Sequence, residues 1–429
     1  MGKESFLITD FGAQGDGLTD NTKVFSELIE KVQNNGGGEI IVPPGIYLTG
    51  SLKLCSNLTL FVMSGAILSF IDEESYYPAV ISRWEGVERE VHRACVYGSK
   101  ISNLTIDGGG TIDGNGSTWW KLFKEEKLDL PRPYLVSIEH SNNIKIKNLT
   151  FINSPSWTLH PMECTNIVID SVTVINPKES PNTDGLDPES CNDVRIVNSV
   201  FDVGDDCIAI KSGTEQTKVK SKCQNIIISN CNMRRGHGGV VIGSEMSGDI
   251  QNVVISNCIF YNTDRGIRMK TRRGRGGKIS DISVSNIIMT GTLCPIVINS
   301  YYFCGPSGKE KYVWDKSKLD VDVRTPEYEH ISIHNIIAKN VKSAGIFVYG
   351  LPEMPIKDLN ITDIQIYLDP DSNPIEPAMI SNAPKLSQAG IFIENTINTR
   401  ISTVQMSGVS GEIFVNNTSN KNMTIDNVC

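Results

Sequence analysis

The stretch Asn252–Tyr261, with the sequence NVVISNCIFY, holds two short apolar strands joined by a polar turn. Apolar and polar residues alternate within it and Val and Ile are frequent, as is typical of β-strands. Similar segments begin at Asn143, Asn166, Asp193, Asn225 and Asp281, and more divergent copies begin at His330, Asp358 and Asn398. The clearer copies follow one another about every 23 to 32 residues, a period that indicates the coils of a stacked solenoid.

A single-stranded, right-handed parallel β-helix fits this repeat best. Its coils lie about 4.8 Å apart and bury ladders of Ile, Val and Asn side chains. A leucine-rich horseshoe would need a leucine spacing and a helical stretch that the repeat lacks, and a propeller would need about four strands in roughly 40 or more residues. No Pro-rich, Ser-rich or single-sign charge run divides the chain. The sequence therefore predicts an all-β protein with one β-helix domain over residues 1–429.

The N-terminal region, about residues 1–70, is predicted to form a cap and the first coils. Residues Asp20–Asn34 (DNTKVFSELIEKVQN) have the pattern of an amphipathic helix, with Asp20 as its cap and Gly36–Gly38 at its end. Such a helix would cover the open end of the β-helix, since terminal coils need capping. Two insertions, Asp72–Val96 and Tyr301–Tyr328, interrupt the repeat and are predicted to form loops over a groove.

Composition limits the classes of partner. Of the 429 residues, 39% are hydrophobic and 21% are charged, which is ordinary for a globular protein. The formal net charge of −9 argues against general nucleic-acid binding. No apolar stretch is long enough to span a bilayer, so no membrane partner is expected.

The eleven cysteines form neither a Cys-x-x-Cys pair nor a Cys/His cluster. They are predicted to be buried small hydrophobic residues of a reduced cytosolic protein, and neither a metal nor a cofactor is expected. The start of the chain carries no secretory signal, which predicts a cytoplasmic protein, or a secreted one if a leader has been removed. The sequence leaves the oligomeric state open.

Four short polar clusters recur at nearly the spacing of the repeat. They are Asn182-Thr183-Asp184, Gly204-Asp205-Asp206, Gly236-His237-Gly238 and Arg268-Met269-Lys270. Each alone has an ordinary explanation, such as an Asx turn, a solvated acidic pair or an exposed strand face. On successive coils, however, all four would lie side by side on one wall, and their joint order argues for an active site.

The residue types in these clusters point to a reaction. On a strand, residues i and i+2 face the same way, so Asn182 and Asp184 would point together, as would Arg268 and Lys270. The adjacent Asp205 and Asp206 can both reach a groove only if the backbone bends there, and Gly204 gives the latitude for it.

Three carboxylates match the acid–base hydrolysis of a glycosidic bond. The pKa values of neighbouring carboxyl groups move apart, so that one group can act as the acid and another as the base. Arg268 and Lys270 match a sugar that carries a carboxylate, and His237 lies among glycines where backbone can approach a ligand. The basic stretch Lys270–Arg275 beside them suggests a local anion site.

These motifs resemble glycoside hydrolase family 28, the polygalacturonases. The stretches that carry the resemblance are SPNTDG (Ser180–Gly185), VGDDCIAIKSG (Val203–Gly213), RGHGGVVIGSE (Arg235–Glu245), RGIRMKT (Arg265–Thr271), ITDFGAQGDGLTDNT (Ile8–Thr22) and RPYLV…FINSPSWTLHP (Arg132–Pro161). They cover nearly the whole chain. Where the family usually has Arg-Ile-Lys, this chain has Arg268-Met269-Lys270.

The resemblance implies roles for the clusters. Asp205 would be the general acid, and Asp184 and Asp206 would activate the water, with inversion at the anomeric carbon. His237 would support the acid or touch substrate. The substrate-binding residues would be Asn182, Arg268, Lys270 and Tyr302.

The implied substrate is galacturonan or an oligogalacturonide with α-1,4 bonds. The stretches RWEGVE (Arg83–Glu88) and INSYYFCGP (Ile298–Pro306) are similar to bacterial exo-acting members of the family. This similarity implies loops that close one end of the groove, so that the enzyme would release galacturonic acid from a chain end. An endo-acting enzyme and a hydrolase of xylogalacturonan or rhamnogalacturonan remain alternatives. A pectate lyase, which would need a calcium-binding carboxylate cluster, and a non-catalytic carbohydrate-binding β-helix fit less well.

Overall fold

The computed structural model describes residues 4–305, 307–416 and 418–429. They form two compact units, Met1–Asp205 (unit 1) and Asp206–Cys429 (unit 2), and each is described here by itself. In each unit parallel strands follow one another in coils, and the fold is the right-handed parallel β-helix that the repeat predicts. One continuous domain over the whole chain stays a prediction.

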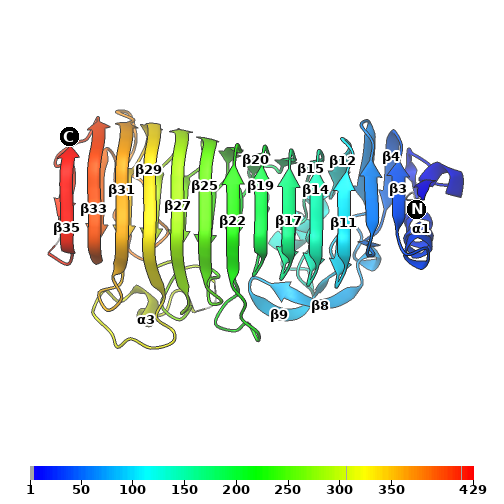
Figure 1. Ribbon diagram of the computed structural model, residues 1–429, viewed down its shortest axis with the longest axis horizontal. Coiled ribbons are helices and arrows are strands. Elements are labelled where there is room, and N and C mark those ends of the chain that lie inside the picture. Colours follow the sequence, from blue (N-terminus) through cyan, green and yellow to red (C-terminus); the bar gives the residue numbers. More distant parts are fainter. Residues whose placement is uncertain (1–3, 306, 417) are drawn as a thin grey trace. The chain divides into compact units, whose positions relative to one another are not determined.

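Unit 1 contains two parallel sheets, called here sheets A and B of unit 1. Sheet A holds β1 (Ser5–Leu7), β2 (Asp16–Asp20), β3 (Gly38–Val42), β4 (Gly45–Thr49), β6 (Leu58–Val62), β7 (Ala66–Phe70), β11 (Ser102–Asp107), β12 (Thr111–Asp113), β14 (Asn142–Lys147), β15 (Thr150–Ile152), β17 (Thr165–Asp170), β18 (Thr173–Ile175), β19 (Asn192–Val197) and β20 (Val200–Val203). Sheet B holds β5 (Leu52–Lys53), β10 (Val96–Ser99), β13 (Val136–Glu139) and β16 (Leu159–Met162). Figure 1 shows β11, β14 and β17 side by side.

Unit 2 repeats this arrangement with longer strands. Its sheet A holds β22 (Cys223–Ser229), β23 (Asn232–Arg235), β25 (Ile250–Tyr261), β27 (Lys278–Thr290), β29 (Glu327–Val341), β31 (Ile356–Leu368), β33 (Thr396–Ser407) and β35 (Lys421–Val428). Its sheet B holds β21 (Ile208–Ile210), β24 (Gly238–Gly243), β26 (Arg265–Lys270), β28 (Cys294–Asn299), β30 (Ala344–Tyr349), β32 (Ala389–Glu394) and β34 (Phe414–Asn416). Figure 1 shows β25 to β35 of sheet A in sequence order, from green to red.

Columns of aliphatic side chains form the interior of each unit. In unit 2, Ile255 pairs with Val284, Val284 with Ile333, and Ile333 with Ile361 on successive coils. All four side chains are fully buried. Each such side chain contributes roughly 1.5–3 kcal/mol through burial, so the Ile and Val of the repeat hold the coils together.

The backbone conformation explains why asparagine recurs at the start of the repeats. Asn103, Asn143 and Asn166 all adopt positive φ, near 56–60°, at the second residue of β11, β14 and β17. Asparagine tolerates this left-handed region better than other side chains that have a Cβ. Their amides also form a ladder, with Asn143 Nδ2 donating to Asn103 Oδ1 at 3.0 Å and Asn166 Nδ2 to Asn143 Oδ1 at 2.7 Å. The Asn that starts each repeat therefore sets both the turn and the stacking.

The predicted N-terminal helix is α1 (Thr22–Asn34). Its N-cap is Asn21, one residue later than predicted, while Asp20 Oδ1 accepts the Thr22 N–H at 2.8 Å. The helix buries Phe25, Leu28, Ile29 and Val32, and it contacts β3, β4 and β5 of the first coils as a cap should.

Both predicted insertions fold into defined structure. The first contains the 3-10 turn η2 (Glu74–Tyr76) and an antiparallel hairpin, β8 (Ala79–Trp84) and β9 (Val87–His92). The second contains the short helix α3 (Lys311–Trp314). The remaining helical elements are η1 (Ile8–Phe11) and α2 (Ser117–Lys124).

The cysteines are free thiols, and nine of the eleven are buried, as predicted. In the part of the chain that the structure describes, no helix combines the length and the apolar character needed to cross a membrane.

Candidate active site

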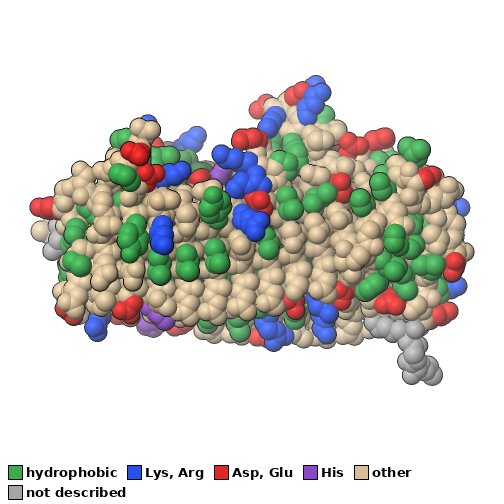
Figure 2. Space-filling model, turned by 90° about the horizontal axis from the view of Figure 1, so that it is seen from above, with side chains coloured by type: hydrophobic (Ala, Val, Ile, Leu, Met, Phe, Trp, Pro, Cys, Tyr) green, Lys and Arg blue, Asp and Glu red, His purple; other side chains and the backbone are tan. Residues whose placement is uncertain are grey.

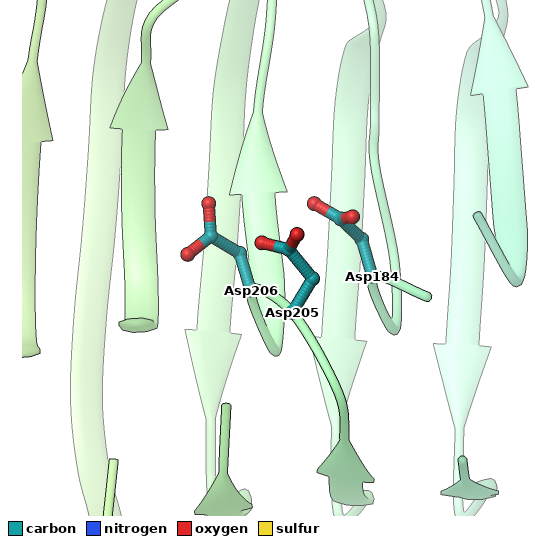
Figure 3. A group of neighbouring side chains, drawn as sticks. All are labelled: Asp184, Asp205 and Asp206. Atoms are coloured by element: carbon teal, nitrogen blue, oxygen red, sulfur yellow. The ribbon is translucent and has the colours of Figure 1, made fainter. Parts of the chain in front are cut away.

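Asp184, Asp205 and Asp206 bring their carboxylates together. Each offers an oxygen, and these oxygens lie within 4.8 Å of one another. Figure 3 shows the three side chains in a row, with the carboxyl group of Asp205 between those of Asp206 and Asp184. The backbone bends between β20 and β21, as the sequence requires if both adjacent aspartates are to lie in this row.

Gly204 permits the close packing of two loops beside the aspartates. A Cβ atom at Gly204 would lie 2.6 Å from the Ser180 carbonyl oxygen and 2.7 Å from that of Pro177. These distances are far below normal contact, so any side chain there would push away the loop that carries Asp184. Gly204 is therefore required for close approach.

The alternation argument was wrong for Asn182 and Asp184. They lie in a loop between β18 and β19 rather than on a strand, and Asn182 adopts a φ of 52°. The Asn182 Oδ1 atom accepts a hydrogen bond from Arg132 Nη2 at 2.8 Å. Asn182 therefore shapes the loop, and its contact with substrate stays a prediction.

Arg132 organises the loop of Asp184, a role that the sequence argument missed. Its Nη1 donates to the carbonyl oxygens of Pro155 and Pro181, at 2.8 and 2.7 Å, and its side chain is buried. Burial lowers the pKa of Arg132 to about 10, while Glu85 and Asp184 act in the opposite direction. The guanidinium therefore stays charged at neutral pH. Its place within the quoted RPYLV stretch was the available signal.

A buried arginine anchors the hairpin β8–β9 to the rest of unit 1. Arg83 Nη2 lies 2.7 Å from Glu163 Oε1, and Arg83 Nη1 lies 3.2 Å from Glu189 Oε1. Beside it, Trp84 stacks on Tyr134 with ring centroids 5.2 Å apart. The predicted loop is therefore a hairpin that ion pairs and ring stacking anchor within unit 1.

In unit 2, Asp206 is held by two cations. Arg268 Nη1 donates to its Oδ1 at 3.1 Å and Lys270 Nζ to its Oδ2 at 2.8 Å. Both cations lie on β26, and Met269 between them faces the interior, as alternation predicted. Burial acts to raise the pKa of Asp206, but Lys270 and Arg268 together hold it well below its ordinary value, with a smaller effect of His237. Asp206 is therefore a carboxylate that stays ionised and can act as a base.

His237 lies in the bend between β23 and β24 and is exposed. A Cβ at the following Gly238 would lie 2.3 Å from Val241 Cγ2 and 3.0 Å from Asp206 Oδ1, so glycine is needed for this close packing. The glycine-flanked histidine therefore lies next to Asp206 in unit 2.

The structure distinguishes the two adjacent tyrosines. Tyr302 lies with its ring 4.8 Å from Lys270 Nζ and 5.6 Å from the Arg268 guanidinium carbon. Tyr301 is fully buried and packs beside Arg273 and Tyr349. Tyr302 is therefore the tyrosine beside the site, as the resemblance implied.

The basic stretch after Lys270 does not form the anion site that its composition suggested. Arg272 and Arg275 both pair with Glu215, at 2.7 and 2.5 Å, and Arg273 pairs with Glu353, at 2.5 Å. These three guanidiniums therefore serve structure. Figure 2 shows one face of the molecule on which Lys and Arg side chains gather in a compact group.

A second buried pair, Lys211–Glu245, lies in the same unit. Lys211 Nζ is 3.3 Å from Glu245 Oε2. Burial acts to raise the pKa of Glu245, but Lys211, Arg275 and Lys270 lower it to about 2. Both residues lie within motifs quoted above, yet neither was predicted to be functional.

Among the residues that the structure describes, Asp184, Asp205 and Asp206 lie close enough together to hold a cation. Arg268 and Lys270 already neutralise Asp206, so a metal there would lie close to two positive charges. The arrangement is better suited to proton transfer between carboxylates and a substrate.

A parallel β-helix with three adjoining aspartates and paired cations defines a carbohydrate-cleaving enzyme of the acid–base type. The model of "Glycosyl hydrolases family 28" matches residues 79–344, and the chain belongs to this family of glycoside hydrolases. A "Probable polygalacturonase" of Vitis vinifera is 34% identical over 376 residues, which cover 85% of this chain and 74% of that protein.

Two solved structures resemble the protein closely. An exopolygalacturonase from Thermotoga maritima has a TM-score of 0.78 and 29% identity, covering 95% of this chain and 93% of that one. A family 28 exopolygalacturonase from Yersinia enterocolitica has a TM-score of 0.79 and 21% identity, covering 100% and 78%. The second likeness concerns the fold alone.

Proposed function

We propose that the protein hydrolyses α-1,4-galacturonosidic bonds from one end of galacturonan or oligogalacturonide chains and releases galacturonic acid. The observation that carries this proposal is the cluster of Asp184, Asp205 and Asp206 with Arg268 and Lys270 on Asp206. The family acts on galacturonan. The likeness to the Thermotoga exopolygalacturonase, together with the RWEGVE stretch that the β8–β9 hairpin contains, supports action at a chain end.

Each carboxylate has a role in this proposal. Asp206 is ionised and serves as a base, with Asp184 sharing the attacking water, and Asp205 protonates the leaving oxygen. An ammonium has three N–H donors, of which Asp206 accepts one from Lys270, so the same cation can also bind a galacturonate carboxylate.

The stereochemical outcome needs a direct measurement. Oxygens within 4.8 Å of one another are closer than the roughly 6.5–9.5 Å between the carboxyl groups of most inverting glycosidases. Inversion is proposed because of the family resemblance, with the water held between Asp184 and Asp206. Proton NMR of the first product should show the β-anomer, and an initial α-anomer would contradict inversion.

Chromatography of products from polygalacturonate tests the function. We expect galacturonic acid as the first product, and an early mixture of oligomers would instead indicate internal cleavage. Asp205→Asn should lower kcat by about 10²- to 10⁴-fold, whereas Asp426→Asn, an exposed aspartate of β35, should not. An unsaturated product that absorbs ultraviolet light would identify a lyase and overturn the proposal.

A further inference from the structure

The chain segment between β31 and β32 covers part of sheet B in unit 2. This segment, residues 369–388, is called here the strap. An antiparallel bridge closes its base, where Ile375 and Leu386 exchange two backbone hydrogen bonds of 2.9 Å. Ser343 Oγ also donates to the Ile375 carbonyl oxygen at 2.8 Å. The strap is therefore a closed and anchored loop.

The first arm of the strap, residues 376–379, contacts two arginines of β26. Arg265 donates to the carbonyl oxygens of Glu376 and Pro377, at 2.9 and 3.1 Å. The Sδ atom of Met379 lies 2.9 Å from Arg268 Nη2. The strap therefore contacts the same guanidinium that holds Asp206.

The register of sheet B explains what the strap covers. Arg268 pairs with Val297 on β28, Val297 with Phe347 on β30, and Phe347 with Phe392 on β32. Paired residues of parallel strands face the same side, so the column that contains Arg268 becomes apolar on the following coils. Val297 and Phe347 are fully buried, and Phe347 stacks on Phe392 with centroids 4.8 Å apart.

The strap supplies the side chains that bury this apolar column. Ala378 and Ile380 belong to one hydrophobic cluster with Val297 and Phe347, and Ile380 also bridges to Tyr302. An acidic sugar placed beyond Arg268 in this column would have to displace this packing and would meet apolar side chains. In the column of Arg268 the charged side chains therefore end on β26, whereas the column of Lys270 continues as Asn299, Tyr349 and Glu394.

We propose that the strap is a wall that ends the glycan-binding site on the Arg268 side, and that it limits how many sugar units bind there. Met379 is the specificity-determining residue at this wall. The inference rests on the proposed action on galacturonides, and it assigns the limit on that side to residues 369–388.

Three variants test the wall. Met379→Ala removes the contact with Arg268. A second variant replaces residues 377–384 with two glycines and keeps the base of the strap. Lys385→Ala, an exposed residue of the same loop, is the matched control.

The readout is the ratio of kcat/KM for tetragalacturonate to that for digalacturonate. We expect the shortened strap to raise this ratio about tenfold and Met379→Ala about threefold, while Lys385→Ala leaves it unchanged. A ratio within about twofold of the wild-type ratio in Met379→Ala and in the shortened variant would overturn the wall. If the shortened variant does not fold, Met379→Ala decides alone.

Calorimetry separates this inference from the proposed function. In an Asp205→Asn background, affinity for tetragalacturonate relative to digalacturonate should rise when Met379 is replaced, whether or not the protein is a hydrolase. Absence of hydrolysis by the wild type would refute the function, whereas an unchanged relative affinity would refute the wall.

Discussion

Replacing Lys270 with methionine tests whether the paired cations control the base. Methionine keeps much of the length and the apolar stem but removes the ammonium that lies 2.8 Å from Asp206 Oδ2. Arg268 remains at 3.1 Å, so the carboxylate keeps one cation.

The size of the effect follows from the burial of the pair. The side chains of Lys270 and Asp206 are 7% and 1% exposed, so water screens their attraction little. A hydrogen bond to a charged group contributes about 1.5–3 kcal/mol, and one pKa unit corresponds to about 1.4 kcal/mol. We therefore expect the pKa of Asp206 to rise by about 1 to 2 units.

The assay is the pH dependence of kcat/KM on digalacturonate, followed by the release of reducing ends. Because Lys270 lowers the pKa of Asp206, its loss should move the acidic limb of the profile upward by about 1 to 2 pH units. Lost binding of the substrate carboxylate would raise KM but leave the limb in place. Lys145→Met, at an exposed lysine of β14, is the matched control. An unmoved acidic limb in Lys270→Met would refute the assignment of Asp206 as the base.

Three further predictions concern the buried pairs and the backbone of the repeat. Glu245→Gln should lower the free energy of unfolding by about 3 kcal/mol at pH 7, because the pKa of Glu245 in the folded protein, about 2, lies below its ordinary value of 4.5. This stabilisation is present above about pH 4.5 and is lost as the pH falls toward 2. In urea unfolding, the difference in stability between wild type and variant should therefore be smaller at pH 3 than at pH 7. Arg273→Met leaves Glu353 buried without its ion-pair partner and should lower the free energy of unfolding by about 3–5 kcal/mol. The double variant Arg273→Met with Glu353→Leu should recover most of this stability in the same urea assay. Asn252, at a φ of 56°, should tolerate glycine better than alanine by about 1 kcal/mol in thermal unfolding, and equal stabilities would contradict a conformational role for this turn.

Much of the fold could be predicted because its causes are local. Alternation and β-branched residues mark the strands, and an asparagine such as Asn252 at the start of a repeat marks a left-handed turn. The prediction that Arg268 and Lys270 share one face was correct, because residues i and i+2 of a regular strand point to the same side. The same rule failed for Asn182 and Asp184, because that loop is held by Arg132, about fifty residues earlier in the chain.

The strap was missed although the sequence carried a weak signal. The copies of the repeat that begin at Asp358 and Asn398 lie 40 residues apart, more than the usual period, and the extra residues include Pro370, Pro374, Pro377 and Pro384. Such a signal indicates an insertion but not where it folds. The contact between Arg268 and Met379 joins residues 111 positions apart, and no local pattern predicts such a pair.

The sequence by itself determined the β-helix, the order of the four polar clusters and the acidic character of the expected substrate. Only the tertiary structure decided that Arg268 and Lys270 hold Asp206, that Arg272, Arg273 and Arg275 are neutralised within the protein, and that the strap covers the coils beyond Arg268. The physical reason is the distance along the chain over which each interaction acts. Periodicity and turn preference act within one coil, whereas the partner of a buried charge is set by the packing of segments distant in the sequence.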